Sequence, residues 1–412
     1  MSLSLELKEI FEASLLNLEK KTINFGVAVS GGSDSVALLM LLLPWSLKNN
    51  KKLFVVTVDH GLRRAAIDEA SYVKKLCLKN SVKHEILKIN KAVKGNVQAW
   101  ARENRYKLIS KWAKKNRIQS VFLGHTLNDQ AETVLLRLGR GSGVDGLAGM
   151  RSESIRENLL WLRPLLNIDR FILRDFLKSK NVTFIDDPSN EDTKFNRVKV
   201  RKLLSKSNDF GLDSIRLNET ASRMSQARDV LNKVAFEFAK KNIFVSIIGT
   251  LVIDLPTFED ELPETKFRIL LYSIKWISGN IYGARAKAIE HALQESINGK
   301  ARTIGGCVIF RIEDKLHIWR EYNAVKNLTQ LNGIWDGRWS VPKTIETRAC
   351  GMDGLNKIEN WKAIDLPKKA LVSMPTIWKN GKVIDYIFSE DERSSIKLIT
   401  PRKDFYTGIL SY

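Results

Sequence analysis

Residues 25–43 constrain the fold of this chain more than any other stretch. An apolar run with two valines, residues 25–29, is followed by a longer leucine-rich run, residues 36–43. The first run predicts a short buried strand, and the second predicts a helix packed against a sheet. Between them lies a loop of small residues, called the serine–glycine loop below: Ser30-Gly31-Gly32-Ser33-Asp34-Ser35. A strand, a tight turn and a helix in succession favour an α/β fold with a parallel sheet.

The serine–glycine loop has the chemistry of an anion site. Gly31 and Gly32 permit positive φ, and the N–H groups that open the next helix favour a phosphate. Asp34 would repel a phosphate unless Mg²⁺ lay between them, which indicates a metal position. The spacing differs from that of a Walker A loop and resembles the PP-loop of ATP pyrophosphatases, which cut ATP between its α and β phosphates. The alternative is a turn in which Ser33 or Asp34 only caps a buried helix.

Strands and helices alternate through the rest of the first half of the chain. Strands are expected at residues 53–58, 85–89 and 120–123, and helices at 3–20, 65–79, 97–116 and 129–138. This order predicts a doubly wound parallel sheet with helices on both faces. Polar motifs follow the carboxyl ends of the strands, where open α/β sheets bind ligands.

We expect three domains. Residues 1–208 would form the ATP-binding catalytic domain, because the helices expected at 170–180 and 196–205 end in a cluster of serine and asparagine. Residues 209–323 predict a mixed, mainly helical domain: helices at 213–242, 264–278 and 283–297, a strand at 250–255, and a hairpin of 303–312 with 315–321. Residues 324–412 have short β-like runs with Gly, Pro and Trp, which predict a small β-rich domain.

Composition limits the partners and the compartment. The 412 residues carry a formal net charge of +21, which favours a polyanion such as nucleic acid, although drift in composition would also produce exposed lysines. The three cysteines are far apart, which argues against disulfides and a cysteine zinc site and fits a reducing cytoplasm. Charged residues near the N-terminus and short apolar runs predict neither a signal peptide nor a membrane span.

Two further motifs supply arginines. Asp59, His60 and Arg63 follow the second strand, where Arg63 could hold a phosphate or Asp59 could simply cap a turn. On the helix expected at 97–116, Arg102 and Arg105 lie three residues apart and could bind a polyphosphate. A solvated basic helix would give the same pattern.

The motif after the fourth strand combines a histidine with carboxylates. His125, Asp129 and Glu132 are spaced four and three residues apart, so they should project from one side of a helix start. This set suits Mg²⁺ binding or proton transfer, whereas a lone histidine is usually structural. Further on, Arg197 and Arg201 lie one helical turn apart and could grip a nucleotide or RNA phosphate, or belong to a capped surface helix.

Six motifs in order resemble those of the tRNA(Ile)-lysidine synthases. They are SGGSDS, VDHGLR, NVQAWARENRY, GHTLNDQAETVLLRLGRGSGVDGLAGM, RPLL and DPSNEDTKFNRVKVR. The resemblance is dense over residues 25–205, looser over the middle of the chain and faintest at its end. It implies a cytoplasmic ligase, monomeric or homodimeric, that uses ATP and Mg²⁺ to join free L-lysine to C2 of the wobble cytidine of tRNA(Ile) with a CAU anticodon. The reaction runs through an adenylated cytidine, gives lysidine, AMP and pyrophosphate, and changes codon reading from AUG to AUA.

The resemblance also implies roles for individual residues. Catalytic roles fall on Asp34, Asp129, Glu132, His125, Arg102 and Arg201. ATP contacts fall on Ser30, Gly31, Gly32, Ser33, Asp34, Ser35, Asp59, His60, Arg63, Arg105 and Arg197. Asp34 and Asp129 would hold the Mg²⁺, and the C-terminal domains would hold tRNA.

One departure and three rival functions remain. The family commonly has two aspartates where this chain has Asn128 and Asp129, so any role of the first carboxylate is in question. A tRNA thiolase of the same fold would need a catalytic cysteine or a cysteine-bound cluster, and only Cys77 lies in the first domain. A synthetase of free nucleotides would need neither the further domains nor the positive charge. A non-catalytic RNA-binding protein would not need the carboxylates.

Overall fold

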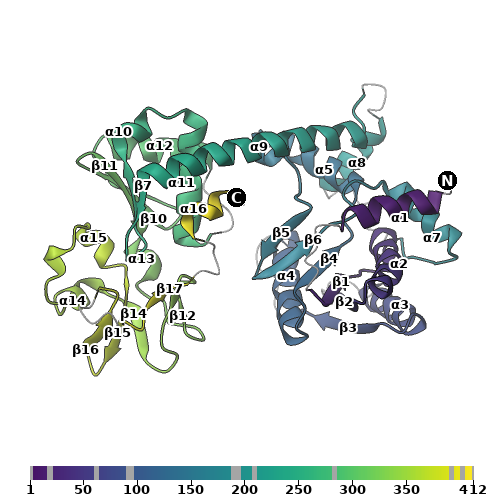
Figure 1. Cartoon of the computed structure of the whole chain (residues 1–412), viewed down its shortest axis with the longest axis horizontal. Coiled ribbons are helices and arrows are strands. Elements are labelled where there is room, and N and C mark those ends of the chain that lie inside the picture. The colour runs from purple at the N-terminus through teal and green to yellow at the C-terminus, as the bar shows by residue number, and fades with distance from the viewer. Residues whose placement is uncertain are drawn as a thin grey trace. The chain divides into compact units, whose positions relative to one another are not determined.

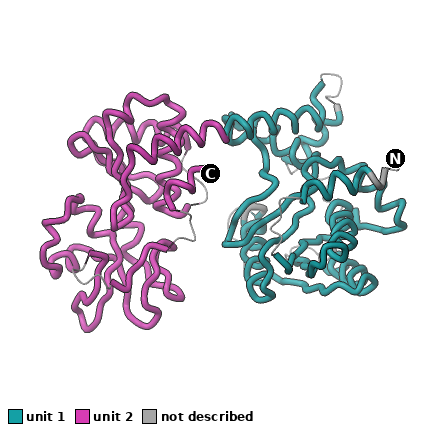
Figure 2. The backbone as a smooth tube through the Cα atoms, viewed as in Figure 1, with its two compact units in different colours: residues 1–228 teal, residues 229–412 magenta. Residues whose placement is uncertain are grey.

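The described residues form two compact units. The computed structural model describes residues 3–15, 22–59, 65–89, 97–186, 196–206, 211–280, 285–388, 394–399 and 404–410. Unit 1 covers residues 1–228 and unit 2 covers residues 229–412 (Figure 2). The boundary between them falls inside helix α9 (Ser214–Asn242). The predicted division into three domains stays a prediction.

Unit 1 is built on a six-stranded sheet in the order β3-β2-β1-β4-β6-β5 (Figure 1). Its strands are β1 (Asn24–Ala28), β2 (Lys52–Asp59), β3 (Lys83–Lys88), β4 (Ser120–Leu123), β5 (Glu153–Arg156) and β6 (Leu159–Leu162). All neighbours pair in parallel except β5, which runs antiparallel to β6 at the edge. Its helices besides the start of α9 are α1 (Leu3–Ala13), α2 (Ser33–Lys48), α3 (Ala65–Lys79), α4 (Val97–Lys115), α5 (Leu127–Leu138), α6 (Val144–Leu147), α7 (Arg170–Ser179) and α8 (Asn196–Lys206).

Alternation along the strands sends apolar side chains to both faces of this sheet. Phe25 and Val55 lie in one buried cluster with residues of α1, α2, α3 and α7. Val56 and Val121 lie in a second cluster with Tyr106, Ile109 and Trp112 of α4. Since both faces are covered by helices, the predicted doubly wound parallel sheet is confirmed.

The strand order reverses beside β1, and this reversal places the loops of interest together. β2 pairs with one side of β1, whereas β4 pairs with the other side. The loops that leave β1 and β4 therefore diverge at the same sheet edge, which is the usual ligand position in open α/β sheets. Gly124 lets these loops approach closely, because a Cβ there would lie 3.0 Å from Ser35 Cα and 3.1 Å from the carbonyl carbon of Asp34.

Unit 2 combines helices with three antiparallel sheets (Figure 1). Its five-stranded sheet has the order β7-β8-β11-β10-β9, and its two three-stranded sheets have the orders β12-β13-β17 and β14-β15-β16. The strands are β7 (Ile243–Val245), β8 (Leu251–Asp254), β9 (Arg302–Ile304), β10 (Cys307–Ile312), β11 (Lys315–Arg320), β12 (Ile334–Trp335), β13 (Trp339–Ser340), β14 (Glu346–Ala349), β15 (Pro375–Lys379), β16 (Lys382–Tyr386) and β17 (Lys397–Leu398). The helices are α10 (Leu255–Glu259), α11 (Pro263–Ser278), α12 (Ala286–Ile297), α13 (Tyr322–Val325), α14 (Gly351–Leu355), the 3-10 helix η3 (Trp361–Ala363), α15 (Lys368–Leu371) and α16 (Phe405–Leu410). The predicted fold class, mainly helical in the middle and β-rich at the end, is confirmed.

Three local features differ from the elements expected from sequence. The β5–β6 hairpin was not expected, because each strand has only four residues. The run 303–312 is not one strand: Gly305 and Gly306 have φ of 59° and 75° and turn the chain between β9 and β10. The first helix ends at Ala13, and the next two residues form a turn. Within the described ranges, no helix combines the length and apolarity needed to cross a bilayer.

Candidate active site

Hydrogen bonds among its own atoms stabilise the conformation of the serine–glycine loop. The hydroxyl of Ser35 accepts a hydrogen bond from the N–H of Ser30 at 3.1 Å and donates one to the carbonyl of Gly32 at 3.0 Å. Gly31 has a φ of 96°, which favours glycine over residues with a side chain. Within the described chain, no acceptor is paired with the backbone N–H groups of Ser33, Asp34 and Ser35. These donors open helix α2, so an anion placed there would meet both hydrogen-bond donors and the helix dipole.

Two carboxylates from neighbouring loops converge on one cation. Arg170, the first residue of α7, donates from Nε to Asp34 Oδ2 at 2.8 Å. Its Nη2 lies 3.5 Å from Asp129 Oδ1. Burial raises the pKa of Asp34, and the nearby charge of Asp129 adds to this effect although Arg170 opposes it. Burial would also raise the pKa of Asp129, but Arg170 and the N–H of Thr126 outweigh it and lower that pKa.

Asn128 connects this arginine to helix α5. Its side-chain carbonyl accepts the N–H of Arg170 at 2.8 Å, and its Nδ2 donates to Asp169 Oδ2 at 3.3 Å. Asp169 in turn caps α7, because its Oδ1 accepts the N–H of Phe171 at 2.7 Å. The carboxamide at position 128 therefore donates on one side and accepts on the other, which a carboxylate cannot do.

Glu132 is the third acid of the site and is nearly inaccessible to solvent, with its side chain 1% exposed. It forms an ion pair with Arg201 of α8, whose Nη2 lies 3.4 Å from Glu132 Oε2. Burial raises the pKa of Glu132, while the hydrogen bond from Arg201 opposes the rise. A carboxylate with a raised pKa is a stronger proton acceptor than an ordinary carboxylate.

His125 is held neutral at physiological pH. Burial, together with the positive charges of Arg163, Arg105 and Arg102, lowers its pKa to about 3, although Asp129 opposes them. Its Nδ1 is buried, and no described atom forms a hydrogen bond with it. Such a nitrogen can accept or donate one hydrogen bond to a substrate without adding charge.

Arg102 and Arg105 gather around the ring of Tyr106 on α4. Their Cζ atoms lie 5.3 Å and 5.9 Å from its centroid, and that of Arg156 lies 4.2 Å away. Burial would raise the pKa of Tyr106, but the charges of Arg102, Arg163 and Arg105 lower it. No acidic side chain of the described ranges forms an ion pair with Arg102 or Arg105. This concentration of positive charge favours an anion, as expected for a polyphosphate.

The two bridged carboxylates fit a magnesium ion. Asp34 and Asp129 already direct oxygens toward a common cationic group, the guanidinium of Arg170. In the described part of the chain, no three His, Cys, Asp or Glu side chains gather to hold a metal by themselves. Mg²⁺ is commonly held by one or two carboxylates together with substrate phosphates and water, so a two-carboxylate set beside an anion loop is compatible with it.

Most of the predicted site residues come together in unit 1. Asp34 and Asp129 share Arg170, and Glu132 binds Arg201. Arg197 is exposed, and its charge acts on both Arg105 and Asp129. Asp59 ends β2 at the same sheet edge. His60 and Arg63 lie outside the described residues.

Two arginines of the site were not expected from the sequence, Arg170 and Arg174. Arg174 donates from Nη2 to Asp186 Oδ1 at 2.6 Å, and its Nε lies 3.4 Å from Ser33 Oγ. Ser33 Oγ donates to Asp34 Oδ1 at 3.0 Å, so the arginine connects α7 to the loop. The signal available in the sequence was Asp169 just before a helical run, which marks a helix start but not what that start faces.

The three cysteines lack the features of a reactive thiolate. Cys77, Cys307 and Cys350 are all buried and free of disulfides. Burial raises the pKa of each thiol to about 12. None therefore has the lowered pKa that characterises a reactive cysteine.

Comparison with known proteins places these features in a family. A family model described as a PP-loop domain matches residues 3–208. The tRNA(Ile)-lysidine synthase of Ruegeria pomeroyi is 37% identical to this chain over 394 residues, which cover 94% of each chain. That of Wolbachia pipientis is 34% identical over 383 residues, which cover 87% of each.

Among solved structures, the chain is similar to the U34-tRNA thiolase NcsA from Methanococcus maripaludis. The TM-score is 0.47 and the identity 18%, over 54% of this chain and 79% of that one.

Proposed function

Since this chain belongs to the tRNA(Ile)-lysidine synthase family, we propose that it joins L-lysine to C2 of the wobble cytidine of tRNA(Ile) with a CAU anticodon. ATP is converted to AMP and pyrophosphate. The observation that carries the proposal is the arrangement in unit 1. Asp34 and Asp129, which follow two different strands, converge on one cation beside the N–H groups of the serine–glycine loop.

The first step we propose is adenylation of the cytidine. Its O2 attacks the α-phosphorus of ATP, a P–O bond forms, and pyrophosphate leaves as the bond to the β-phosphate oxygen breaks. Backbone N–H groups of the serine–glycine loop are placed to stabilise the developing negative charge, and Arg102 and Arg105 add positive charge. Mg²⁺ held by Asp34 and Asp129 would neutralise charge on the phosphate oxygens.

The second step we propose is displacement of AMP by lysine. The ε-amine of lysine attacks C2, the C2–O2 bond breaks, and AMP leaves with the oxygen. The amine must lose a proton to become a nucleophile. Glu132 is a candidate acceptor because burial raises its pKa, and Asp129 is a candidate for orienting the amine.

We assign Arg170 a positioning role. Its two contacts hold the carboxylates of Asp34 and Asp129 toward each other, although their like charges repel. The charge of Arg170 opposes the rise in the pKa of Asp34 that burial and Asp129 cause.

The function is tested by incorporation of labelled lysine into a tRNA(Ile) transcript in the presence of ATP and Mg²⁺. We expect incorporation with a CAU anticodon and none when the wobble cytidine is replaced by uridine. Pyrophosphate release without lysine incorporation would mean a ligase with another nucleophile. Absence of both would contradict a ligase function altogether.

The metal position has its own test, Asp34→Asn. We expect this variant to need more Mg²⁺ for half-maximal pyrophosphate release while its tRNA affinity stays within twofold of the wild-type value. An unchanged Mg²⁺ requirement, or an equal loss of tRNA affinity, would contradict the assignment.

A further inference from the structure

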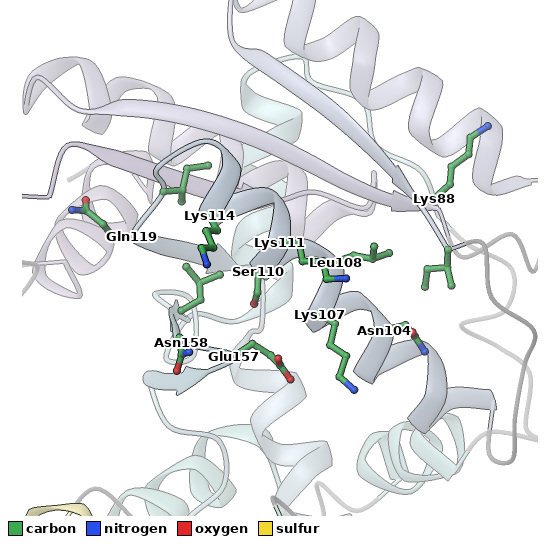
Figure 3. A pocket seen from close by; sticks show the side chains of 13 residues that line it. Lys88, Asn104, Lys107, Leu108, Ser110, Lys111, Lys114, Gln119, Glu157 and Asn158 are labelled. Carbon is green, nitrogen blue, oxygen red and sulfur yellow. The ribbon is translucent and has the colours of Figure 1, made fainter. Parts of the chain in front are cut away.

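A basic pocket lies between α4 and the β5–β6 turn (Figure 3). Its volume is about 910 Å³. It is lined by the end of β3, one face of α4, the approach to β4 and the β5–β6 turn. The lining residues are Lys88, Ile89, Asn104, Lys107, Leu108, Ser110, Lys111, Lys114, Ile118, Gln119, Glu157, Asn158 and Leu159.

The lysines of the pocket share one helix face. Lys107, Lys111 and Lys114 are four and three residues apart, so they line up along α4, as Figure 3 shows. Arg102 and Arg105 lie roughly 140° and 160° around the helix from Lys107, at about 100° per residue. The pocket and the arginine cluster thus use different faces of the same helix.

Positive charge exceeds negative charge in this pocket. Four of its lining residues are lysines, and Glu157 is the acid among them. Lys107 also pairs with Glu103 at 2.7 Å, but both side chains are more than 40% exposed. Such an exposed pair adds little energy and leaves the ammonium free to exchange partners. A net excess of ammonium groups attracts a phosphate-bearing polyanion.

The lining of the pocket offers groups that can contact the phosphates, sugars and bases of a nucleotide chain. Glu157 and Asn158 have φ of 53° and 56°, so the tight β5–β6 turn forms one wall opposite α4. Isoleucines and leucines contribute an apolar lining, and the amides of Asn104 and Gln119 contribute hydrogen-bonding groups. Ammonium groups suit phosphodiesters, while apolar and amide surfaces suit sugars and base edges.

We propose that this pocket binds the phosphodiester backbone of the tRNA substrate, away from the nucleotide whose base reacts. The proposal rests on the proposed function, which makes tRNA the polyanion that unit 1 must hold. Free ATP is a poorer match, because the serine–glycine loop lies at the carboxyl end of β1 and contributes no residue to this pocket.

The test uses the full-length chain with the substitutions Lys107→Gln, Lys111→Gln and Lys114→Gln combined. Binding to the CAU tRNA is measured by filter retention between 50 and 300 mM salt. We expect affinity to fall about tenfold or more at 0.1 M salt, and the slope of log Kd against log salt to be shallower by about two to three. ATP affinity should stay unchanged.

A matched control removes three lysines elsewhere in unit 1. Lys74, Lys75 and Lys79 of α3 are exposed and do not line the pocket, so their combined change to Gln should leave the affinity within about threefold. Equal losses for the two triple variants would overturn the proposal, as would an unchanged affinity and slope for the α4 variant. Loss of ATP affinity alone would also overturn it, in favour of a free-nucleotide site. Failure of the wild-type chain to bind tRNA would instead contradict the proposed function.

Discussion

Arg170 shows how one residue can organise two loops. Its guanidinium contacts Asp34 after β1 and Asp129 at the start of α5. A bidentate cation between two acids offsets their repulsion and fixes the direction in which each carboxylate points. The orientation of Arg170 depends in turn on Asn128, which accepts its backbone N–H.

The structure therefore gives Asn128 a role that a second aspartate could not fill here. In the variant Asn128→Asp, a carboxylate would replace the amide that now donates to Asp169, and two like charges would meet at hydrogen-bonding distance. We expect the rate of pyrophosphate release to fall about tenfold and the stability to fall by about 1–2 kcal/mol. The readouts are the initial rate as a function of Mg²⁺ and the midpoint of thermal unfolding.

An exchange of the two residues provides the control. In the double variant Asn128→Asp with Asp169→Asn, the amide at 169 can donate to the acid at 128 and still cap α7 through its carbonyl. Both the rate and the unfolding midpoint should recover. If the double variant is as impaired as the single one, Asn128 does not act through Asp169.

His125 should stay neutral throughout the physiological range. Its pKa is lowered to about 3, so its ring resonances should not shift between pH 8 and pH 5. The measurement is NMR on histidine-labelled protein, with the His125 signal assigned by its loss in His125→Gln. Titration of that signal near pH 6.5 would contradict the burial of the ring.

The same shift has a consequence for stability. Between pH 6.5 and about pH 3, the unfolded chain binds a proton at His125 and the folded chain does not. The free energy of unfolding should therefore fall with decreasing pH in that window, by at most about 1.4 kcal/mol per pH unit from this group. Above pH 6.5, His125 is neutral in both the folded and the unfolded chain, so this group no longer makes the free energy of unfolding depend on pH.

At the scale of elements, the site depends on how closely β4 approaches the start of α2. A Cβ at Gly124 would lie about 3 Å from backbone atoms of Asp34 and Ser35, where no flexible side chain can give way. We expect Gly124→Ala to raise the KM for ATP and to destabilise the chain by about 1–3 kcal/mol, because the loop must shift. The measurements are steady-state kinetics and urea unfolding.

Gly143 offers a matched control for this substitution. No atom lies within 4 Å of a Cβ built there, and its φ is −78°, which alanine adopts easily. Gly143→Ala should leave the KM for ATP and the stability close to the wild-type values. Similar effects of the two substitutions would show that loss of a glycine, and not the close approach, is responsible.

At the scale of the whole molecule, unit 1 includes the first turns of α9. Leu217 and Ala221, in the first turns of α9, pack against Ala131 and Val134 of α5. Helix α5 carries Asp129 and Glu132, so these contacts support the candidate site. The first turns of α9 are thus part of the core of unit 1.

Two fragments test this conclusion. A fragment of residues 1–228 should fold and bind ATP, whereas one of residues 1–205 should unfold at a temperature about 5 °C lower or more, because it exposes α5. Circular dichroism melts and ATP titrations provide the comparison. Equal stability of the two fragments would mean that α9 is dispensable for unit 1.

The sequence by itself determined the α/β class, and it predicted the anion-binding loop and the acids of the candidate site. These features are local: the 25–43 run combines strand, turn and helix signals within 19 residues, and Asp129 and Glu132 share a helix. The family resemblance followed from the same local motifs.

Only the tertiary structure decided which residues meet. Arg170 lies 136 residues beyond Asp34, and Arg201 lies 69 beyond Glu132, so no periodicity links them. The basic pocket likewise joins β3, α4 and a turn that was not expected from the sequence. Contacts of this kind depend on strand order and helix packing. Both result from interactions along the whole sheet, so no single position of the chain indicates them.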